Sequence, residues 1–194
     1  MPADVEVPIV IVGFGHSDDI VKCLGALAKQ RGCPKYGVFI CENGGPAAFD
    51  ALVKALSEDG APCEGSVEHA EPASNDFVRA GRLRLAGIET PVVIGEARDN
   101  GGHAGGINAW LRPLLAEPGW SAVWILNPDT SPEPDALAEL VDYAEKRGKG
   151  MVGKPAHDPR PIRHRLISGP EMEQAQRQAD RRRHVRSGLA CSRP

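Results

Sequence analysis

The residues best suited to chemistry lie in the segment VWILNPDTSPEPDAL, residues 123–137. Four apolar residues there run straight into Asn127, Pro128 and Asp129, so a strand that looks buried ends on a carboxylate held between prolines. Such a carboxylate suits a hard divalent cation, because Mg²⁺ is commonly bound by one or two carboxylates together with phosphate oxygens and water. Asn127 can add a neutral oxygen. The alternative is that Asp129 or Thr130 only caps the following helix.

Three other segments with candidate functional residues also follow predicted strands. Residues 98–108, RDNGGHAGGIN, contain four glycines within six positions. These allow a ligand to approach backbone N–H groups at a helix start, or they serve tight packing of the helix on the sheet. In ENGG, Glu42 can accept a hydrogen bond from a ribose hydroxyl or a base N–H, or the segment is a plain turn. VGFGHSD has Asp18 at the third glycine of the dinucleotide fingerprint, which disfavours a nicotinamide or flavin enzyme.

Alternating strands and helices position these segments. We predict strands at 8–12, 36–41, 91–96 and 122–126, and helices from about Ser17, Pro46, Ala104 and Thr130, with Pro113 kinking or ending the third helix. Residues 61–75 are predicted to form a loop, 75–86 a short helix, and 150–153 the start of a fifth strand. This order predicts an α/β fold, a mainly parallel sheet flanked by helices. Ligands bind such sheets beyond the carboxyl ends of the strands, where all four segments lie.

The charge distribution divides the chain at residue 153. Residues 1–153 carry 13 basic and 22 acidic side chains, whereas residues 154–194 carry 10 and 4. We therefore expect a folded domain over 1–153 and a basic, irregular, mobile tail over 154–194. The nine arginines of the tail would bind nucleic acid only weakly, since no aromatic platform accompanies them, so no nucleic-acid partner is expected.

The cysteines and the apolar runs bear on location. The five cysteines form no C-x-x-C pair, and an odd number without framework spacing suits free thiols in a reducing cytosol. No apolar run reaches the ~20 residues of a spanning helix. We expect a cytoplasmic protein, with any membrane contact peripheral and at the inner face.

Taken together, the four segments resemble the family-2 inverting glycosyltransferases, which have the GT-A fold and use nucleotide-diphosphate sugars. The similarity is greatest to the rhamnosyltransferase-like branch, whose pattern N-x-G-x-x-x-G-x-N is followed by L-N-P-D. In this sequence the pattern reads Asn100, Gly102, Gly106 and Asn108, then Leu126–Asp129. The resemblance covers residues 8 to about 153 and implies a GT-A-like (Rossmann-like) domain.

The resemblance also implies a role for each matching residue. Gly13, Phe14 and Glu42 would bracket the nucleobase and ribose; Asn100, Gly102 and Asn108 would line the nucleotide side of the cleft; and Asn127 and Asp129 would form the D-x-D-like motif, with Asp129 holding Mg²⁺ or Mn²⁺ on the diphosphate. The family usually has Thr-Tyr-Asn at positions 13–15 and Asp at position 42. The choice among dTDP-, UDP- and GDP-linked sugars therefore stays open.

The second half of the family's pattern has no counterpart after Gly153. That half supplies the acceptor site and the carboxylate general base, usually in or near an E-D dipeptide. We therefore expect a truncated fold that transfers sugar poorly or not at all to a saccharide or lipid-linked acceptor. An uncovered sheet edge would favour self-association. A non-catalytic nucleotide-binding module is the alternative function.

Overall fold

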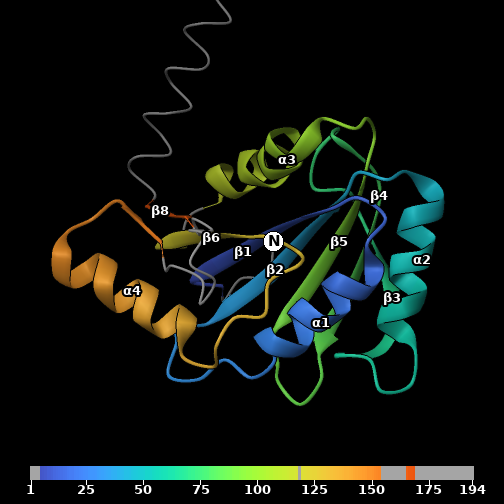
Figure 1. Cartoon of the computed structure of the whole chain (residues 1–194). Helices are drawn as coiled ribbons and strands as arrows, with labels where there is room; N and C mark the ends of the chain where they lie inside the picture. The colour runs from blue at the N-terminus through green and yellow to red at the C-terminus, as the bar shows by residue number, and fades with distance from the viewer. Residues whose placement is uncertain (1–4, 118, 154–164, 169–194) are drawn as a thin grey trace, which may run out of the picture.

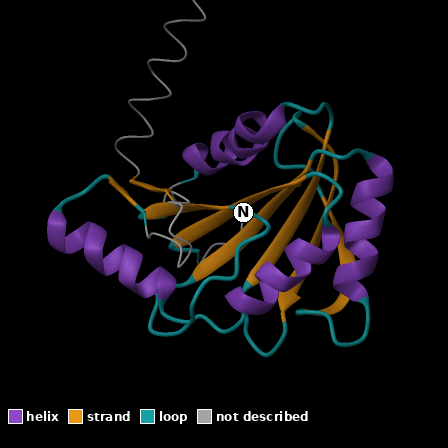
Figure 2. Ribbon diagram, viewed as in Figure 1, coloured by secondary structure: helices purple, strands orange, loops and turns teal. Residues whose placement is uncertain are grey.

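The computed structural model of the chain describes residues 5–117, 119–153 and 165–168. These residues form one mixed sheet with helices on both faces (Figures 1 and 2). The strands are β1 (Val7–Gly13), β2 (Tyr36–Glu42), β3 (Cys63–Ala70), β4 (Phe77–Leu85), β5 (Pro91–Ala97), β6 (Ala122–Leu126), β7 (Met151–Val152) and β8 (Arg165–Ser168). The helices are α1 (Ser17–Leu27), α2 (Pro46–Ser57), α3 (Gly102–Ala116) and α4 (Ala136–Arg147). None of these helices has the length and apolar character needed to span a bilayer.

Parallel strands form the centre of the sheet, whose full order is β3-β4-β5-β2-β1-β6-β8-β7. The parallel pairs join β5, β2, β1 and β6, which are the four strands predicted from the sequence, and antiparallel strands flank them. Gly13 lies opposite Glu42, and Glu42 lies opposite Glu96. Leu126 pairs with Ile11, so the loop after β6 starts at the same edge. The predicted α/β fold is confirmed, and the carboxyl ends of the central strands meet at one edge of the sheet.

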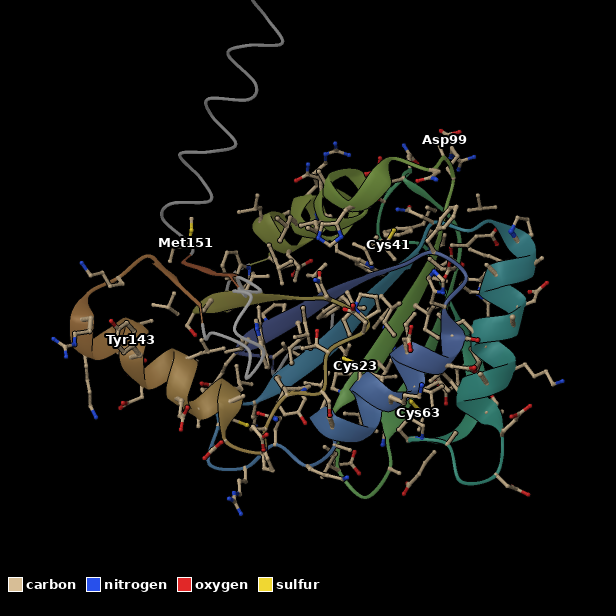
Figure 3. The ribbon with its side chains drawn as sticks, in the orientation of Figure 1. Cys23, Cys41, Cys63, Asp99, Tyr143 and Met151 are labelled. Carbon is tan, nitrogen blue, oxygen red and sulfur yellow. The ribbon has the colours of Figure 1, made fainter. Side chains whose placement is uncertain are left out.

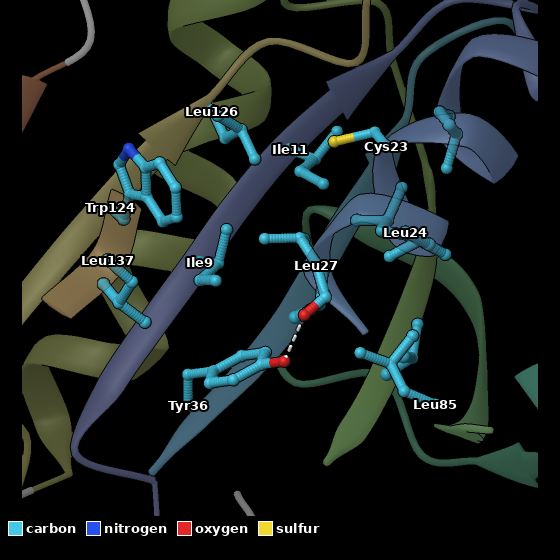
Figure 4. Close-up of a cluster of buried hydrophobic side chains, with 14 of the residues drawn as sticks. Ile9, Ile11, Cys23, Leu24, Leu27, Tyr36, Leu85, Trp124, Leu126 and Leu137 are labelled. Atoms are coloured by element: carbon cyan, nitrogen blue, oxygen red, sulfur yellow. Dashed lines mark hydrogen bonds between the residues drawn. The ribbon is translucent and has the colours of Figure 1, made fainter. Parts of the chain in front are cut away.

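Two apolar clusters hold the helices on the sheet. Helices α1, α2 and α4 pack on one face, and α3 packs on the other (Figure 1). On the first face, Figure 4 shows Ile9 of β1 beside Leu27 of α1, and the Tyr36 hydroxyl donates to the Leu27 carbonyl over 2.6 Å. On the second face, the Trp110 ring lies 5.4 Å from Phe39 and 4.5 Å from Phe77, centroid to centroid. Both faces of the central strands are therefore buried, which explains their continuous apolar sequences.

The hairpin of β3 and β4 corrects the prediction of a loop and a short helix over residues 61–86. The two strands pair antiparallel, and β4 pairs antiparallel with β5. The deciding signal is the alternation at the end of β4, where Leu83 and Leu85 are buried while Arg82 and Arg84 are exposed. A period of two places these leucines on the core face of a strand, and a helix would scatter them.

Two helix boundaries also differ from the predictions. Helix α4 begins at Ala136, and Thr130 instead donates its hydroxyl to the Asn127 carbonyl over 2.6 Å. Pro132 and Pro134 lie between them, and a proline disfavours the helical conformation of the residue that precedes it. Helix α3 contains Pro113 and continues to Ala116, so this proline does not end the helix.

Part of the segment predicted as a tail belongs to the sheet. Strand β8 pairs antiparallel with β6 and with the short β7, which matches the fifth strand expected near 150–153. The remaining residues beyond 153 lie outside the described part of the chain, and their expected mobility stays a prediction.

The buried thiols make the stability of the folded protein depend on pH in the alkaline range. Burial raises the pKa of Cys23, Cys41 and Cys63 from 9.0 to about 12 (Figure 3). Between these values the unfolded chain releases thiol protons that the folded chain retains, so stability falls as pH rises from 9 towards 12. We expect the urea midpoint to drop between pH 8 and pH 10.5, and the three thiols to resist alkylation until the protein unfolds. Rapid alkylation of all three in the native protein at pH 8 would contradict their burial.

Candidate functional site

Glu42, at the end of β2, ties two turns together at the carboxyl edge of the sheet. Its side chain is fully buried, and Oε1 accepts hydrogen bonds from the Gly15 N–H over 2.9 Å and the Gly44 N–H over 2.8 Å. The other carboxylate oxygen, Oε2, is buried and accepts no hydrogen bond from a described residue. A buried acceptor without a donor is rare in folded proteins. Glu42 therefore both shapes this edge and carries an unused acceptor atom beneath it.

Glycine is required on both sides of this carboxylate. A Cβ at Gly13 would lie 2.6 Å from Glu42 Oε2, and a Cβ at Gly44 would lie 2.8 Å from Glu42 Oε1. Gly15 has a φ of +72°, which side chains rarely adopt. Between Gly13 and Gly15, Phe14 is 59% exposed. The turn after β1 thus exposes an aromatic ring on the residue before Gly15, whose N–H binds the buried carboxylate.

Asn43 connects these turns to the glycine-rich start of α3. Its side chain is buried, and Nδ2 donates to the Gly102 carbonyl over 3.0 Å. Its backbone N–H donates to the Gly13 carbonyl over 2.9 Å. Sequence reasoning passed over Asn43, although it lies within the ENGG segment. Its position directly after a strand-end carboxylate was the signal that could have found it.

In the glycine-rich segment, Gly106 packs against the sheet and Gly102 lies at the exposed start of α3. A Cβ at Gly106 would lie 2.7 Å from Val12 Cγ1, so this glycine lets α3 approach β1 closely. Gly102 has a φ of +66°, and its N–H donates to Asn100 Oδ1 over 2.9 Å. Asn100, Gly102 and Asn108 are all exposed. The tight-packing alternative therefore holds for Gly106, while the other predicted residues face solvent.

Alanine substitutions at two adjacent glycines of α3 distinguish the effect of packing against β1 from the effect of helix propensity. Gly106→Ala should destabilise the fold by about 1–3 kcal/mol, the usual result of overpacking. Gly105→Ala should stabilise it by about 0.5–1 kcal/mol, because a Cβ there meets nothing within 4 Å and alanine favours the helix. Urea unfolding of both variants measures the difference. Equal effects would show that α3 does not lie this close to β1.

Asp129 lies in the loop after β6 and does not cap α4. The helix begins at Ala136, its N-cap is Asp135, and no side chain makes a capping hydrogen bond. Asp129 is exposed and makes no ion pair with a described residue. The Cys23 thiol of α1 donates to the Asn127 carbonyl over 3.9 Å, which places the start of this loop beside that helix. The capping alternative for Asp129 and Thr130 is thereby excluded.

A divalent cation at Asp129 would find few protein ligands. The described residues contain no group of three or more His, Cys, Asp or Glu side chains that could hold a metal. Asn127, whose side chain is half-buried, is the neighbouring oxygen donor in the sequence. One carboxylate and one amide leave most of an octahedral Mg²⁺ shell to water and phosphate oxygens. Metal alone should therefore bind weakly at this loop.

The predicted residues are brought together in two groups. Hydrogen bonds link the turns that contain Gly13, Phe14 and Glu42, and Asn43 joins them to Gly102. The loop that contains Asp129 follows β6, the strand beside β1, and starts next to α1, but among the described residues no hydrogen bond connects Asp129 to the first group. A cavity of 570 Å³ lies elsewhere, between Gln30–Tyr36 and the turn before β5, at the opposite ends of the strands.

Known proteins resemble this chain in structure but not detectably in sequence. No protein-family profile and no curated protein matches the sequence. The structure is similar to crystal structures of S. aureus TarS. For the fragment TarS 1-349, the TM-score is 0.57 at 9% sequence identity, covering 89% of this chain and 49% of that one. A longer TarS structure gives a TM-score of 0.50 at 12% identity, covering 81% and 23%.

The similarity defines the fold class. TarS has a GT-A-like glycosyltransferase fold, and this chain shares that fold. The chain spans about half the length of the TarS fragment. Another crystal structure of the fragment is a complex of TarS with UDP-GlcNAc. Its TM-score is 0.48 at 10% identity, covering 79% of this chain and 36% of that one.

Proposed function

We propose that this chain is a glycosyltransferase-like domain that binds a nucleotide-diphosphate sugar together with Mg²⁺ or Mn²⁺. The observation that carries the proposal is the junction of three loops beyond the carboxyl ends of β1, β2 and β5. Glu42 joins the first two loops, and Asn43 joins them to Gly102. In parallel sheets this edge is where nucleotides bind.

Each group of residues has a chemical task in this proposal. The exposed Phe14 ring offers a stacking surface for a base, and Oε2 of Glu42, which has no donor among the described residues, would accept from a ribose hydroxyl or a base N–H. Asn100, Gly102 and Asn108 would line the nucleotide side of the cleft. Asp129, with Asn127, would hold the metal, which supplies positive charge to the diphosphate. Without that cation the carboxylate would repel the ligand.

The proposed reaction is the inverting transfer of a sugar, of the rhamnosyltransferase-like kind, to a saccharide or lipid-linked acceptor. Inversion requires a base that deprotonates the acceptor hydroxyl as it attacks the anomeric carbon. We assign no described residue to that role. The nucleotide-sugar site therefore carries the proposal, and turnover decides between a transferase and a module that only binds its ligand.

Calorimetry with nucleoside diphosphates tests the binding proposal. UDP, dTDP and GDP are titrated into the full chain in Mn²⁺ or in EDTA, and UDP-GlcNAc is added as a donor probe. We expect one diphosphate to bind with metal and none to bind in EDTA. Equal binding in EDTA would remove the metal from the proposal, and failure of every nucleotide would refute it. Release of diphosphate with and without saccharide acceptors then measures turnover.

A further inference from the structure

Arg79 of β4 joins the hairpin to two elements that border the candidate site. Its Nε donates to Glu96 Oε2 at the end of β5, and the two residues face each other in the strand register. Its terminal nitrogen lies 2.8 Å from Asp50 Oδ1 and donates to the Pro46 carbonyl over 3.3 Å. Pro46 and Asp50 belong to the first turns of α2. One guanidinium therefore fastens the start of α2 to the carboxyl end of β5.

A buried aromatic ring and a buried carboxylate also contact the Arg79 guanidinium. The guanidinium carbon lies 4.5 Å from the centre of the Phe49 ring, which is buried. Glu96 is also buried, and its hydrogen bond raises the pKa of Arg79 above the ordinary value. Planar stacking combined with forked hydrogen bonds is specific to arginine and is lost with lysine.

We propose that Arg79 is a positioning residue for the nucleotide site, because it fixes the first turn of α2 and therefore the Glu42–Gly45 turn that immediately precedes it. The consequence for ligand binding rests on the proposed function, whereas the positioning itself follows from these contacts. Gly45 directly precedes Pro46, and the Gly44 N–H donates to Glu42. Displacing the start of α2 would pull that N–H away from the carboxylate.

The neighbouring charges strengthen the argument. Glu42 and Glu96 are adjacent in the register of two parallel strands, and both are buried. Glu42 is stabilised by two backbone N–H groups, and Glu96 is stabilised by Arg79. Removing the guanidinium would leave a buried carboxylate without its cation beside a second one, which is strongly unfavourable. The loss of Arg79 should therefore be felt at the Glu42 turn as well as at β5.

The test compares Arg79→Met with Arg84→Met on the same strand. Arg84 pairs with Glu89 at the surface, and both of these side chains are largely exposed, so its loss provides a matched control. Hydrogen exchange is followed at the Phe49 N–H, which donates to the Gly45 carbonyl over 3.0 Å, and at the amides of β1. For Arg79→Met we expect the Phe49 amide to exchange roughly tenfold faster relative to β1, and nucleotide affinity to fall roughly tenfold. Arg84→Met should change neither.

Two further variants separate positioning from general destabilisation. Arg79→Lys keeps the positive charge but loses the forked hydrogen bonds of the guanidinium, so the Phe49 amide should be partly protected from exchange. Asp50→Asn removes only the ion pair with α2 and keeps the Pro46 and Phe49 contacts, so it should speed exchange at Phe49 by less than Arg79→Met does and leave β1 unchanged. Equal acceleration of Phe49 and β1 in Arg79→Met, or no acceleration at Phe49, would overturn the inference. If wild type binds no nucleotide, the proposed function fails while the exchange data still decide the positioning role.

Discussion

Asp129→Ala is expected to lower the affinity for the nucleoside diphosphate in Mn²⁺ on the order of 100-fold or more. The reason is electrostatic, since the carboxylate is the protein charge assigned to the cation that neutralises the diphosphate. Folding stability should stay close to wild type, because Asp129 is exposed, makes no ion pair with a described residue and does not cap α4. Calorimetry in Mn²⁺ measures the affinity, and urea unfolding measures the stability.

A nearby aspartate provides the control for this experiment. Asp135→Asn changes another carboxylate of the same loop, the N-cap residue of α4, whose side chain makes no capping hydrogen bond. It should bind nucleotide as wild type does. If Asp129→Ala also binds like wild type, the metal assignment is wrong. If both variants weaken binding equally, the effect comes from the total charge of the loop and not from a metal ligand.

Glu42→Ala is expected to have the largest effect on stability among the site variants. The change removes the carboxylate that accepts from the Gly15 and Gly44 N–H groups, and a hydrogen bond to a charged group contributes about 1.5–3 kcal/mol. The two turns should then separate, and nucleotide binding should be lost with them. Urea unfolding and calorimetry on the same preparation measure both effects.

Glu42→Gln separates the structural role of this residue from its proposed role in binding. The amide oxygen of glutamine can still accept from Gly15 and Gly44, so most of the stability should remain. The amide nitrogen takes the place of Oε2 and donates where the carboxylate would accept. We therefore expect nucleotide affinity to fall roughly tenfold, the usual scale for a lost charge-assisted hydrogen bond. Wild-type affinity in Glu42→Gln would make this residue a structural one only.

The centre of the fold could be predicted because its signals are local. The continuous apolar runs of β1 and β2 and the amphipathic helices between them follow from burial on both faces of a parallel sheet. The hairpin of β3 and β4 was missed because its alternation is short and is interrupted by glycines and charged residues. A short amphipathic segment becomes a strand only when a neighbour such as β5 supplies hydrogen bonds.

The sequence by itself placed the candidate residues at the ends of strands. Gly13, Glu42 and Asp129 each follow an apolar run, and parallel strands bring such ends to one edge. Only the tertiary structure decided what each residue does there. It buried Glu42 against two backbone N–H groups, left Asp129 in solvent, and brought Arg79 from an unpredicted strand to the start of α2. These outcomes depend on contacts between residues far apart in the chain, whose partners are set by strand order and register and not by local spacing.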